Sequence, residues 1–251
     1  MYRRLAFVTA LLLALTTVVP GTAFAATQVR VLQLNICHSG AASCFTGDKV
    51  ITKARSVIST TKPHVLSVNE ACSGDVATLR DAMGGARTKF VAAQRPDGSA
   101  VKCRNGQNYG NAIMVVNSVA TGTGVSGRFR NQDSSNEKRV WACLPAGALS
   151  ACTTHLAARD GAVALAQCKE LMSRAVDYAK RAPVVVSGDM NLRYGGTPNA
   201  QDCNRSGFYR KGDGGLQHVF ATKTLTFVSG KKIDMAGTTD HPAWLVTVTK
   251  S

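Results

Sequence analysis

The chain has 251 residues, of which 45% are hydrophobic and 18% charged, and its formal net charge is +15. This composition is too apolar for a disordered tail or a low-complexity polymer, and the length is sufficient for one large domain with its own core. The excess of Lys and Arg favours a polyanionic partner, although basic charge can also serve solubility alone.

The N-terminal residues have the pattern of a secretory signal peptide. Two arginines precede an apolar run over residues 5–19, and Ala-Phe-Ala at residues 23–25 offers a small-x-small cleavage site. A transmembrane anchor is the alternative, but the run is shorter than the ~20 residues that a bilayer span requires. We therefore predict a signal peptide over residues 1–25, a single domain over residues 26–251, and a secreted, extracellular protein.

Strand-like and helix-like patterns alternate along the remaining chain. A β-rich stretch at 29–36 precedes helical spacing at 47–61, and Pro63 separates that helix from a strand at 64–68. The later pattern predicts helices at 74–83 and 161–180, a basic solvated loop at 127–139, and strands at 89–93, 109–115, 140–144, 151–156, 184–186, 216–221 and 244–248. Strands that alternate with helices indicate an α/β class with a mixed sheet or paired sheets.

Eight cysteines lie after the predicted signal peptide. An even number in an exported chain, with no CxxC pair, favours disulfides over zinc. Proximity suggests Cys37 with Cys44, and Cys143 with Cys152 across a hairpin. The other four are assigned as Cys72 with Cys103 and Cys168 with Cys203.

Polar residues suited to metal and phosphate chemistry follow the predicted strands. They are Asn35, Glu70, His155, Asp189, Asn191 and the pair Asp240-His241. Taken singly, each has an ordinary interpretation as a turn residue, a cap or a surface charge. Taken together, they can hold a hard divalent cation, orient a water and stabilise a pentacovalent phosphorus.

These residues lie in segments that resemble, in order, those of the endonuclease/exonuclease/phosphatase superfamily, whose members are similar to deoxyribonuclease I. The segments are VLQLNI at 31–36, VLSVNE at 65–70, YGNAI at 109–113, THL at 154–156, SGDMN at 187–191 and TDHP at 239–242. The resemblance spans residues 29–248. It implies an α/β fold in which two mixed β-sheets, flanked by helices, form a four-layer sandwich.

The resemblance also implies a role for each site residue. Glu70 would be a principal ligand of Mg²⁺, with Asn35 and Asp240 close to the metal and with Mn²⁺ or Ca²⁺ as alternative ions. Asp189 would orient or deprotonate the attacking water, and the choice of general base between Asp189 and His241 stays open. The other implied roles are a phosphate contact for Asn191, proton exchange for His155 and His241, and substrate binding for Tyr109 and Asn111. Arg139 is also predicted to bind substrate, because it belongs to a basic polar stretch.

One segment departs from the family pattern. The family has an aspartate a short distance before the Asp-His pair, and that aspartate orients the final histidine. Here the corresponding place is LQHVF at 216–220, so Gln217 is the expected orienter of His241. An amide brings no negative charge and would raise the histidine pKa less than a carboxylate would. Asp234 is an alternative orienter.

Membership of this superfamily does not name the substrate, because its members include nucleases, lipid phosphodiesterases and phosphatases. Basic residues are frequent in two polar stretches, and this favours a nucleic acid as the substrate. They are Arg128, Arg130, Lys138 and Arg139 in the first and Arg205, Arg210 and Lys211 in the second. DNA is the favoured substrate and RNA the alternative, and charge does not distinguish the two.

Membrane insertion would require an exposed apolar hairpin, and none is evident, since Trp141 and Trp244 both lie in predicted strands. We therefore predict a secreted Mg²⁺-dependent endonuclease that is monomeric and makes no stable membrane association. The alternatives are a sphingomyelinase-like or phospholipase C-like lipid phosphodiesterase and a non-catalytic nucleic-acid-binding module on the same fold.

Overall fold

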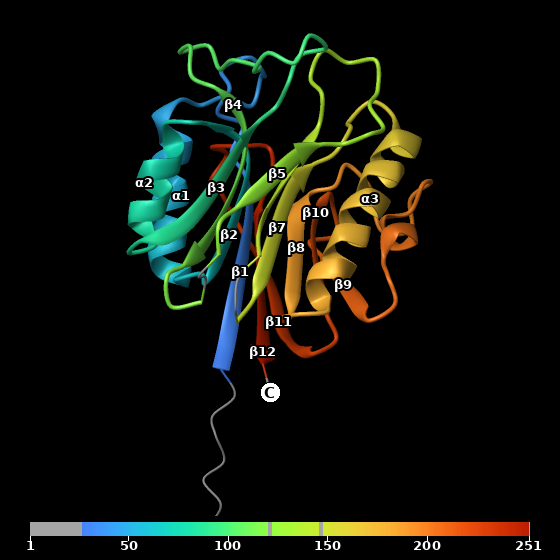
Figure 1. Cartoon of the computed structure of the whole chain (residues 1–251). Coiled ribbons are helices and arrows are strands. Elements are labelled where there is room, and N and C mark those ends of the chain that lie inside the picture. The colour runs from blue at the N-terminus through green and yellow to red at the C-terminus, as the bar shows by residue number, and fades with distance from the viewer. Residues whose placement is uncertain (1–26, 120–121, 146–147, 251) are drawn as a thin grey trace, which may run out of the picture.

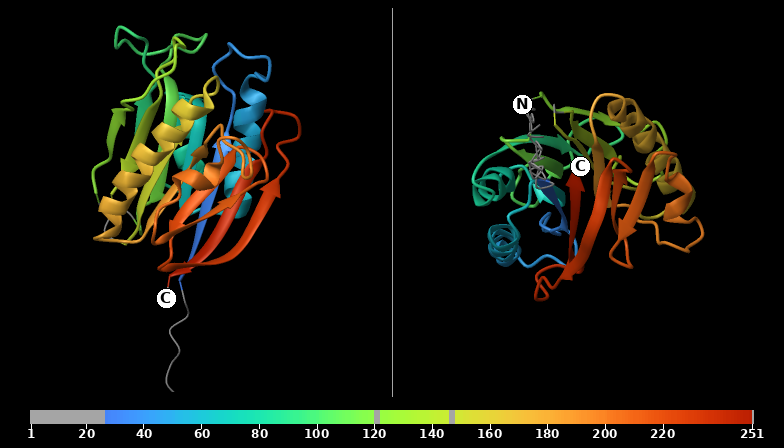
Figure 2. Two further views of the ribbon diagram at one scale, coloured as in Figure 1. Left: turned by 90° about the vertical axis from the view of Figure 1, so that its right-hand side faces the viewer. Right: turned by 90° about the horizontal axis from the view of Figure 1, so that it is seen from below.

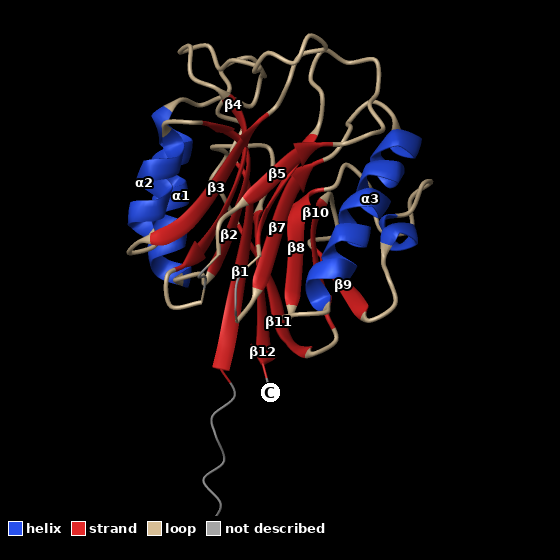
Figure 3. Ribbon diagram, in the orientation of Figure 1, coloured by secondary structure: helices blue, strands red, loops and turns tan. Residues whose placement is uncertain are grey.

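The computed structural model describes residues 27–119, 122–145 and 148–250. Two six-stranded β-sheets pack face to face at the centre of the fold, and helices cover their outer faces (Figure 1). Figure 2 shows the same layers from the side and from below, and Figure 3 separates the outer helices from the central strands by colour. The predicted signal peptide at residues 1–25 lies outside the described residues.

The first sheet combines strands from both ends of the chain. Its spatial order is β11 (Leu225–Ile233), β12 (Ala243–Lys250), β1 (Thr27–Asn35), β2 (Val65–Cys72), β4 (Tyr109–Val116) and β3 (Ala86–Ala92). Strands β1 and β2 are parallel, whereas the other neighbours are antiparallel. Two helices accompany this sheet, α1 (Asp48–Thr61) and α2 (Asp75–Ala82).

The second sheet is built from the middle and later parts of the chain. Its order is β5 (Val125–Arg128), β6 (Val140–Leu144), β7 (Ser150–His155), β8 (Val184–Asp189), β10 (Gln217–Thr222) and β9 (Phe208–Gly212). Strands β7 and β8 are parallel, and α3 (Gly161–Ala179) forms the crossover between them. The helix and the 3₁₀ turn η1 (Ala200–Cys203) cover the outer face of this sheet. The side chain of Asp160 caps α3 by accepting a hydrogen bond from the Val163 amide at 3.0 Å.

Two mixed sheets with outer helices confirm the predicted fold class. The four disulfides pair as expected, Cys37–Cys44, Cys72–Cys103, Cys143–Cys152 and Cys168–Cys203. Such a set is typical of proteins that fold in an oxidising compartment. Within the described part of the chain, no helix is long and apolar enough to span a membrane.

The structure corrects the interpretation of residues 127–139 as a solvated loop. The segment begins within β5, which the sequence analysis did not predict, and Phe129, Asp133 and Arg139 are buried. Strands β9 and β11 were also missed. The alternation in β11 is hidden because most of its residues are exposed at the edge of the first sheet.

The space between the sheets changes character along the strands. At one end it is filled by apolar side chains, including Val31, Val65 and Ile113 from the first sheet and Val185 and Val219 from the second. Further along the same strands the packed residues are amides and hydroxyls, and then an asparagine, a histidine and an aspartate. The polar set is Gln33, Ser67, Asn69, Thr153 and Gln217, followed by Asn35, His155 and Asp189.

Candidate active site

The carboxyl ends of two parallel strand pairs meet at one edge of the molecule. Strands β1 and β2 end beside each other, and so do β7 and β8. Parallel strands bring their terminal side chains to the same edge, where α/β folds gather functional groups. A cleft of about 470 Å³ opens there, and the residues that line it include Glu70, Tyr109, Glu137, Arg139, His155, Arg159, Asp189, Asn191 and His241.

Glu70 is turned toward the cleft by an irregular strand end. The pairing of β2 with β4 shifts register between Val68 and Ala71, and Glu70 has a φ of 57°. Such a bulge redirects a side chain, and a left-handed φ on a residue other than glycine is costly unless the surroundings hold it. Burial raises the pKa of Glu70, and the charges of Glu137 and Asp189 raise it further. The hydrogen bond from Asn35 acts in the opposite direction and lowers this pKa.

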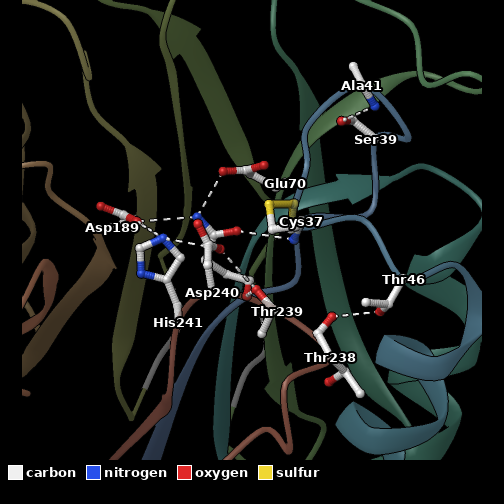
Figure 4. Close-up of a disulfide and its surroundings, with 12 residues drawn as sticks. Cys37, Ser39, Ala41, Thr46, Glu70, Asp189, Thr238, Thr239, Asp240 and His241 are labelled. Carbon is white, nitrogen blue, oxygen red and sulfur yellow. Dashed lines mark hydrogen bonds and ion pairs between the residues drawn. A yellow bond between two sulfur atoms is a disulfide. The ribbon is translucent and has the colours of Figure 1, made fainter.

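Asn35 joins the two carboxylates of the site. Its Nδ2 donates to Oε1 of Glu70 at 2.9 Å and lies 3.2 Å from Oδ2 of Asp189, while its Oδ1 accepts from the Cys37 amide at 3.2 Å. Figure 4 shows Glu70, Asp189, Asp240 and His241 gathered beside the Cys37 disulfide. In this geometry Asn35 orients the carboxylates, and its own oxygen is occupied by the backbone.

Asp189 is the most enclosed carboxylate of the site, with 1% of its surface exposed. Its Oδ1 accepts from the Asn191 amide at 3.0 Å, and its Oδ2 accepts from Nε2 of Gln217 at 3.0 Å. Burial opposes the charge on Asp189, but the neighbouring histidines and the amide donors hold its pKa below the ordinary value. The site is therefore built to keep Asp189 ionised.

His241 lies between three polar groups. Its Nε2 is 3.4 Å from Oδ2 of Asp189 and 3.6 Å from Oδ1 of Asp240, and its Nδ1 is 3.3 Å from Nε2 of Gln217. Gln217 thus contacts His241 through its amide nitrogen and not through its oxygen, and its role as the orienter stays a prediction. The alternative orienter is wrong in this structure, because Asp234 is exposed and its carboxylate accepts from the Ala236 amide.

His155 is the second histidine of the cleft, and it is buried. Its Nδ1 lies 3.9 Å from Oε1 of Glu70 and has no hydrogen-bond partner within the described residues. Burial, with a smaller effect from the Arg139 charge, lowers the pKa of His155 to about 3. The ring is therefore neutral near neutral pH in the free protein.

The expected substrate contacts divide into two groups. Asn191, with φ 47°, lines the cleft and donates from Nδ2 to the Leu156 carbonyl at 2.8 Å. Tyr109 and Arg139 also line the cleft. Asn111 does not line it, since it is 4% exposed and accepts a hydrogen bond from Asn69 at 3.0 Å.

Glu137 is a cleft residue that the sequence analysis missed. Its Oε1 is 2.8 Å from Nη1 of Arg139, and it accepts a hydrogen bond from the Tyr109 hydroxyl. Burial raises the pKa of Glu137, against the effect of Arg139. The only signal in the sequence was its place two residues before Arg139 in the segment interpreted as a solvated loop.

The donor types at the cleft suit a hard divalent cation. Glu70 and Asp240 offer carboxylate oxygens, which such ions prefer. Three carboxylates, Glu70, Glu137 and Asp189, line the cleft beside one buried guanidinium, so added positive charge is favourable there. Asp240 also lies near Cys37 and Cys44, but their disulfide removes them as metal ligands.

Comparisons with known proteins agree with this architecture. No protein-family model and no curated protein match the sequence. Among solved structures, the human Nocturnin catalytic domain with bound sulfate is 17% identical, with a TM-score of 0.69 over 89% of this chain and 94% of that one. D. rerio TDP2 complexed with single-strand DNA product is 16% identical, with a TM-score of 0.66 over 88% and 99%.

A third similar structure carries the superfamily's name. It is the endonuclease/exonuclease/phosphatase from Beutenbergia cavernae, which is 18% identical, with a TM-score of 0.63 over 89% of this chain and 72% of that one. The resemblance predicted from the sequence is therefore confirmed at the level of fold: this chain has the deoxyribonuclease I-like fold of the endonuclease/exonuclease/phosphatase structures.

Proposed function

We propose that the protein is a secreted, metal-dependent phosphodiester hydrolase that cleaves nucleic acids internally. The observation that carries this proposal is a hydrogen-bonded assembly in which Asn35 and Gln217 join three cleft residues, Glu70, Asp189 and His241, and whose members come from strands of both sheets and from the segment before β12. A binding module would have no use for an enclosed, ionised carboxylate next to two histidines, and this argues against the non-catalytic alternative.

Glu70 and Asp240 would hold the cation, which we propose to be Mg²⁺. A bound divalent ion would neutralise charge on the phosphate oxygens as the phosphorus is attacked. Asn35 would keep Glu70 and Asp189 in place through its amide hydrogens. Because that amide lies between the two carboxylates, it also reduces their mutual repulsion.

Asp189 would orient the attacking water and accept its proton. Its lowered pKa keeps the acceptor ionised, and the amide of Gln217 fixes the Oδ2 atom that faces His241. His241 and His155 would donate hydrogen bonds to the charged phosphorane oxygens, and Asn191 would contact another. Preorganised donors of this kind stabilise charge as it develops.

A nucleic acid, and DNA in particular, is the substrate that we propose. Removal of the two arginines in the predicted signal peptide would lower the net charge from +15 to +13, which would still attract a polyanion, and exposed Lys102 and Arg159 lie at the cleft. One protein of the same fold is described with a single-strand DNA product. The four disulfides suit an extracellular location.

Nicking of supercoiled plasmid DNA tests this proposal. The purified protein should nick the plasmid with Mg²⁺ present, and EDTA or the substitution His241→Ala should abolish the activity. Absence of nicking by the intact protein would contradict the proposal. Release of phosphocholine from sphingomyelin vesicles by the same preparation would instead identify a lipid phosphodiesterase.

A further inference from the structure

A carboxylate blocks the only buried guanidinium that lines the cleft in the described chain. Arg139 is 7% exposed, and its Nη1 lies 2.8 Å from Oε1 of Glu137. The same glutamate accepts the hydroxyl hydrogen of Tyr109. Two of the three residues that the sequence analysis assigned to substrate binding, Tyr109 and Arg139, therefore already contact an anion that belongs to the protein.

Arg139 keeps unused hydrogen-bonding capacity despite this ion pair. Its Nε and Nη1 are both buried, and neither makes a hydrogen bond within the described residues, although Nη1 lies close to the Glu137 carboxylate. A buried donor without a partner costs free energy unless a ligand satisfies it. Because Arg139 lines the cleft, a phosphate oxygen bound there is a suitable partner for its guanidinium group.

The charge beside Arg139 sets how much negative charge such a phosphate can carry. Glu137 offsets the guanidinium, and Glu70 and Asp189 add two further carboxylates to the cleft. Lys102 and Arg159, the other Lys and Arg side chains that line the cleft in the described chain, are exposed, and solvent screens their charges. The buried wall therefore has a net negative charge before any cation binds.

We propose that Glu137 restricts the cleft to phosphodiesters by repelling phosphomonoesters. This inference rests on the proposed phosphodiester hydrolase. A diester phosphate carries one negative charge, whereas a monoester carries close to two above its second pKa of about 6. Repulsion by a fixed carboxylate scales with the charge that it faces, so Glu137 penalises the monoester about twice as much as the diester.

The same contact explains why the enzyme would release its product. Hydrolysis of an internal diester leaves a terminal monoester, and this dianion would face Glu137 across the bound guanidinium. Glu137 would thus weaken the binding of the product more than that of the substrate. The residue acts on specificity, and no bond is made or broken at it.

Two matched substrates test the inference. Bis(p-nitrophenyl) phosphate and p-nitrophenyl phosphate share a leaving group and differ by one charge, so their kcat/KM ratio near pH 8 reports the discrimination. The wild-type protein should prefer the diester strongly. In Glu137→Gln, which keeps the size of the side chain and an oxygen for Tyr109, the relative monoester activity should rise about tenfold.

Glu170→Gln is the matched control. Glu170 forms an ion pair with Arg174 at 3.2 Å on α3 and does not line the cleft. Loss of the Glu170 charge should therefore leave the ratio of the two kcat/KM values unchanged. An unchanged ratio in a folded Glu137→Gln protein would overturn the inference. So would equal use of both substrates by the wild type, whereas failure to hydrolyse the diester at all would overturn the proposed function as well.

Inhibition of the wild type gives a second test that needs no variant. Thymidine 5′-phosphate and its methyl ester share a nucleoside and differ in phosphate charge. The methyl ester should inhibit diester hydrolysis at a concentration about tenfold lower than the monoester near pH 8. Tighter binding of the monoester would overturn the role of Glu137.

Discussion

The two halves of the space between the sheets use the same strands for different purposes. Along β1 and β2 the paired positions change from Val31 and Val65 to Gln33 and Ser67. The first pair belongs to the apolar core, and the second contacts the opposite sheet through hydrogen bonds. The strands therefore build a dry core at one end and a polar support for the cleft at the other.

The difference lies in how each half is specified. Apolar side chains pack wherever their volumes fit, and they tolerate neighbours of similar size. A buried amide needs particular partners, because an unpaired donor or acceptor costs about 1–3 kcal/mol. We therefore expect the polar half to control the geometry and activity of the site, and the apolar half to control the stability of the fold. Separate substitutions in the two halves test this expectation.

The largest expected effect is the loss of activity when the ionised acceptor of the polar half is neutralised. Asp189→Asn keeps the shape of the side chain but removes the charge that would accept the proton of the attacking water. Plasmid nicking should fall by a factor of about 10²–10⁴. The unfolding midpoint should stay the same or rise, since a buried carboxylate is lost. Nicking at the wild-type rate would show that another group is the base.

A substitution in the apolar half should lower stability and leave the activity of the folded protein unchanged. Ile113 is fully buried within the apolar half, so Ile113→Ala should lower the free energy of unfolding by about 2–5 kcal/mol. Urea denaturation measures this change, and activity per folded molecule should be retained. Val125→Ala, at an edge position with 40% exposure, is the control and should change stability by less than about 0.5 kcal/mol.

The apolar half was predictable from the sequence because it depends on local periodicity, whereas the layer order was expected from the family resemblance. Helical spacing at 47–61 became α1, and the apolar run at 184–186 became the start of β8. The strand-end rule also placed Glu70, His155 and Asp189 together, since parallel strands deliver their ends to one edge. Local pattern could not reveal β9 and β11, which lie at sheet edges where burial is incomplete.

The hydrogen bonds within the polar half were not predictable, because they join residues far apart in sequence. Gln33 and Gln217 are separated by 184 positions, and Asn35 and Asp189 by 154. Nothing in either local segment indicates the partner. Glu137 was missed for a related reason, since the segment at 127–139 is polar and its burial comes from contacts with other elements.

A pH titration separates the inward and outward faces of β10. Gln217 points into the polar half and does not titrate, whereas its neighbour His218 is buried, with Nε2 2.8 Å from the Leu192 carbonyl and Nδ1 2.9 Å from Nη1 of Arg210. Burial lowers the pKa of His218 to about 4, even though the hydrogen bond to Leu192 and the charge of Asp213 favour the protonated ring.

Stability should therefore fall as the pH drops from about 6.5 to about 4. In this window the unfolded chain binds a proton at His218 that the folded chain does not, so protonation favours unfolding, by up to about 3 kcal/mol. Urea unfolding at about pH 7 and about pH 5, with EDTA present, measures the slope. His218→Gln should flatten it, although buried His155 contributes in the same direction. A slope unaffected by the substitution would remove His218 as a source.

The smallest expected effect tests whether the polar half acts as one network. Nε2 of Gln33 donates to Oδ1 of Asn69 at 2.7 Å and to Oε1 of Gln217 at 2.9 Å, and Gln217 in turn donates to Asp189. The substitution Gln33→Met keeps the volume but leaves both acceptors with one bond fewer, at a cost of about 1–2 kcal/mol. It also frees the Gln217 amide to rotate, so nicking should fall about tenfold even though Gln33 does not line the cleft.

The double variant with Gln217→Met should be less destabilised than the sum of the single variants by about 0.5 kcal/mol or more, because each single change breaks the same bond. Additive effects on stability would mean that the two amides act independently and that Asp189 is held by its own local contacts.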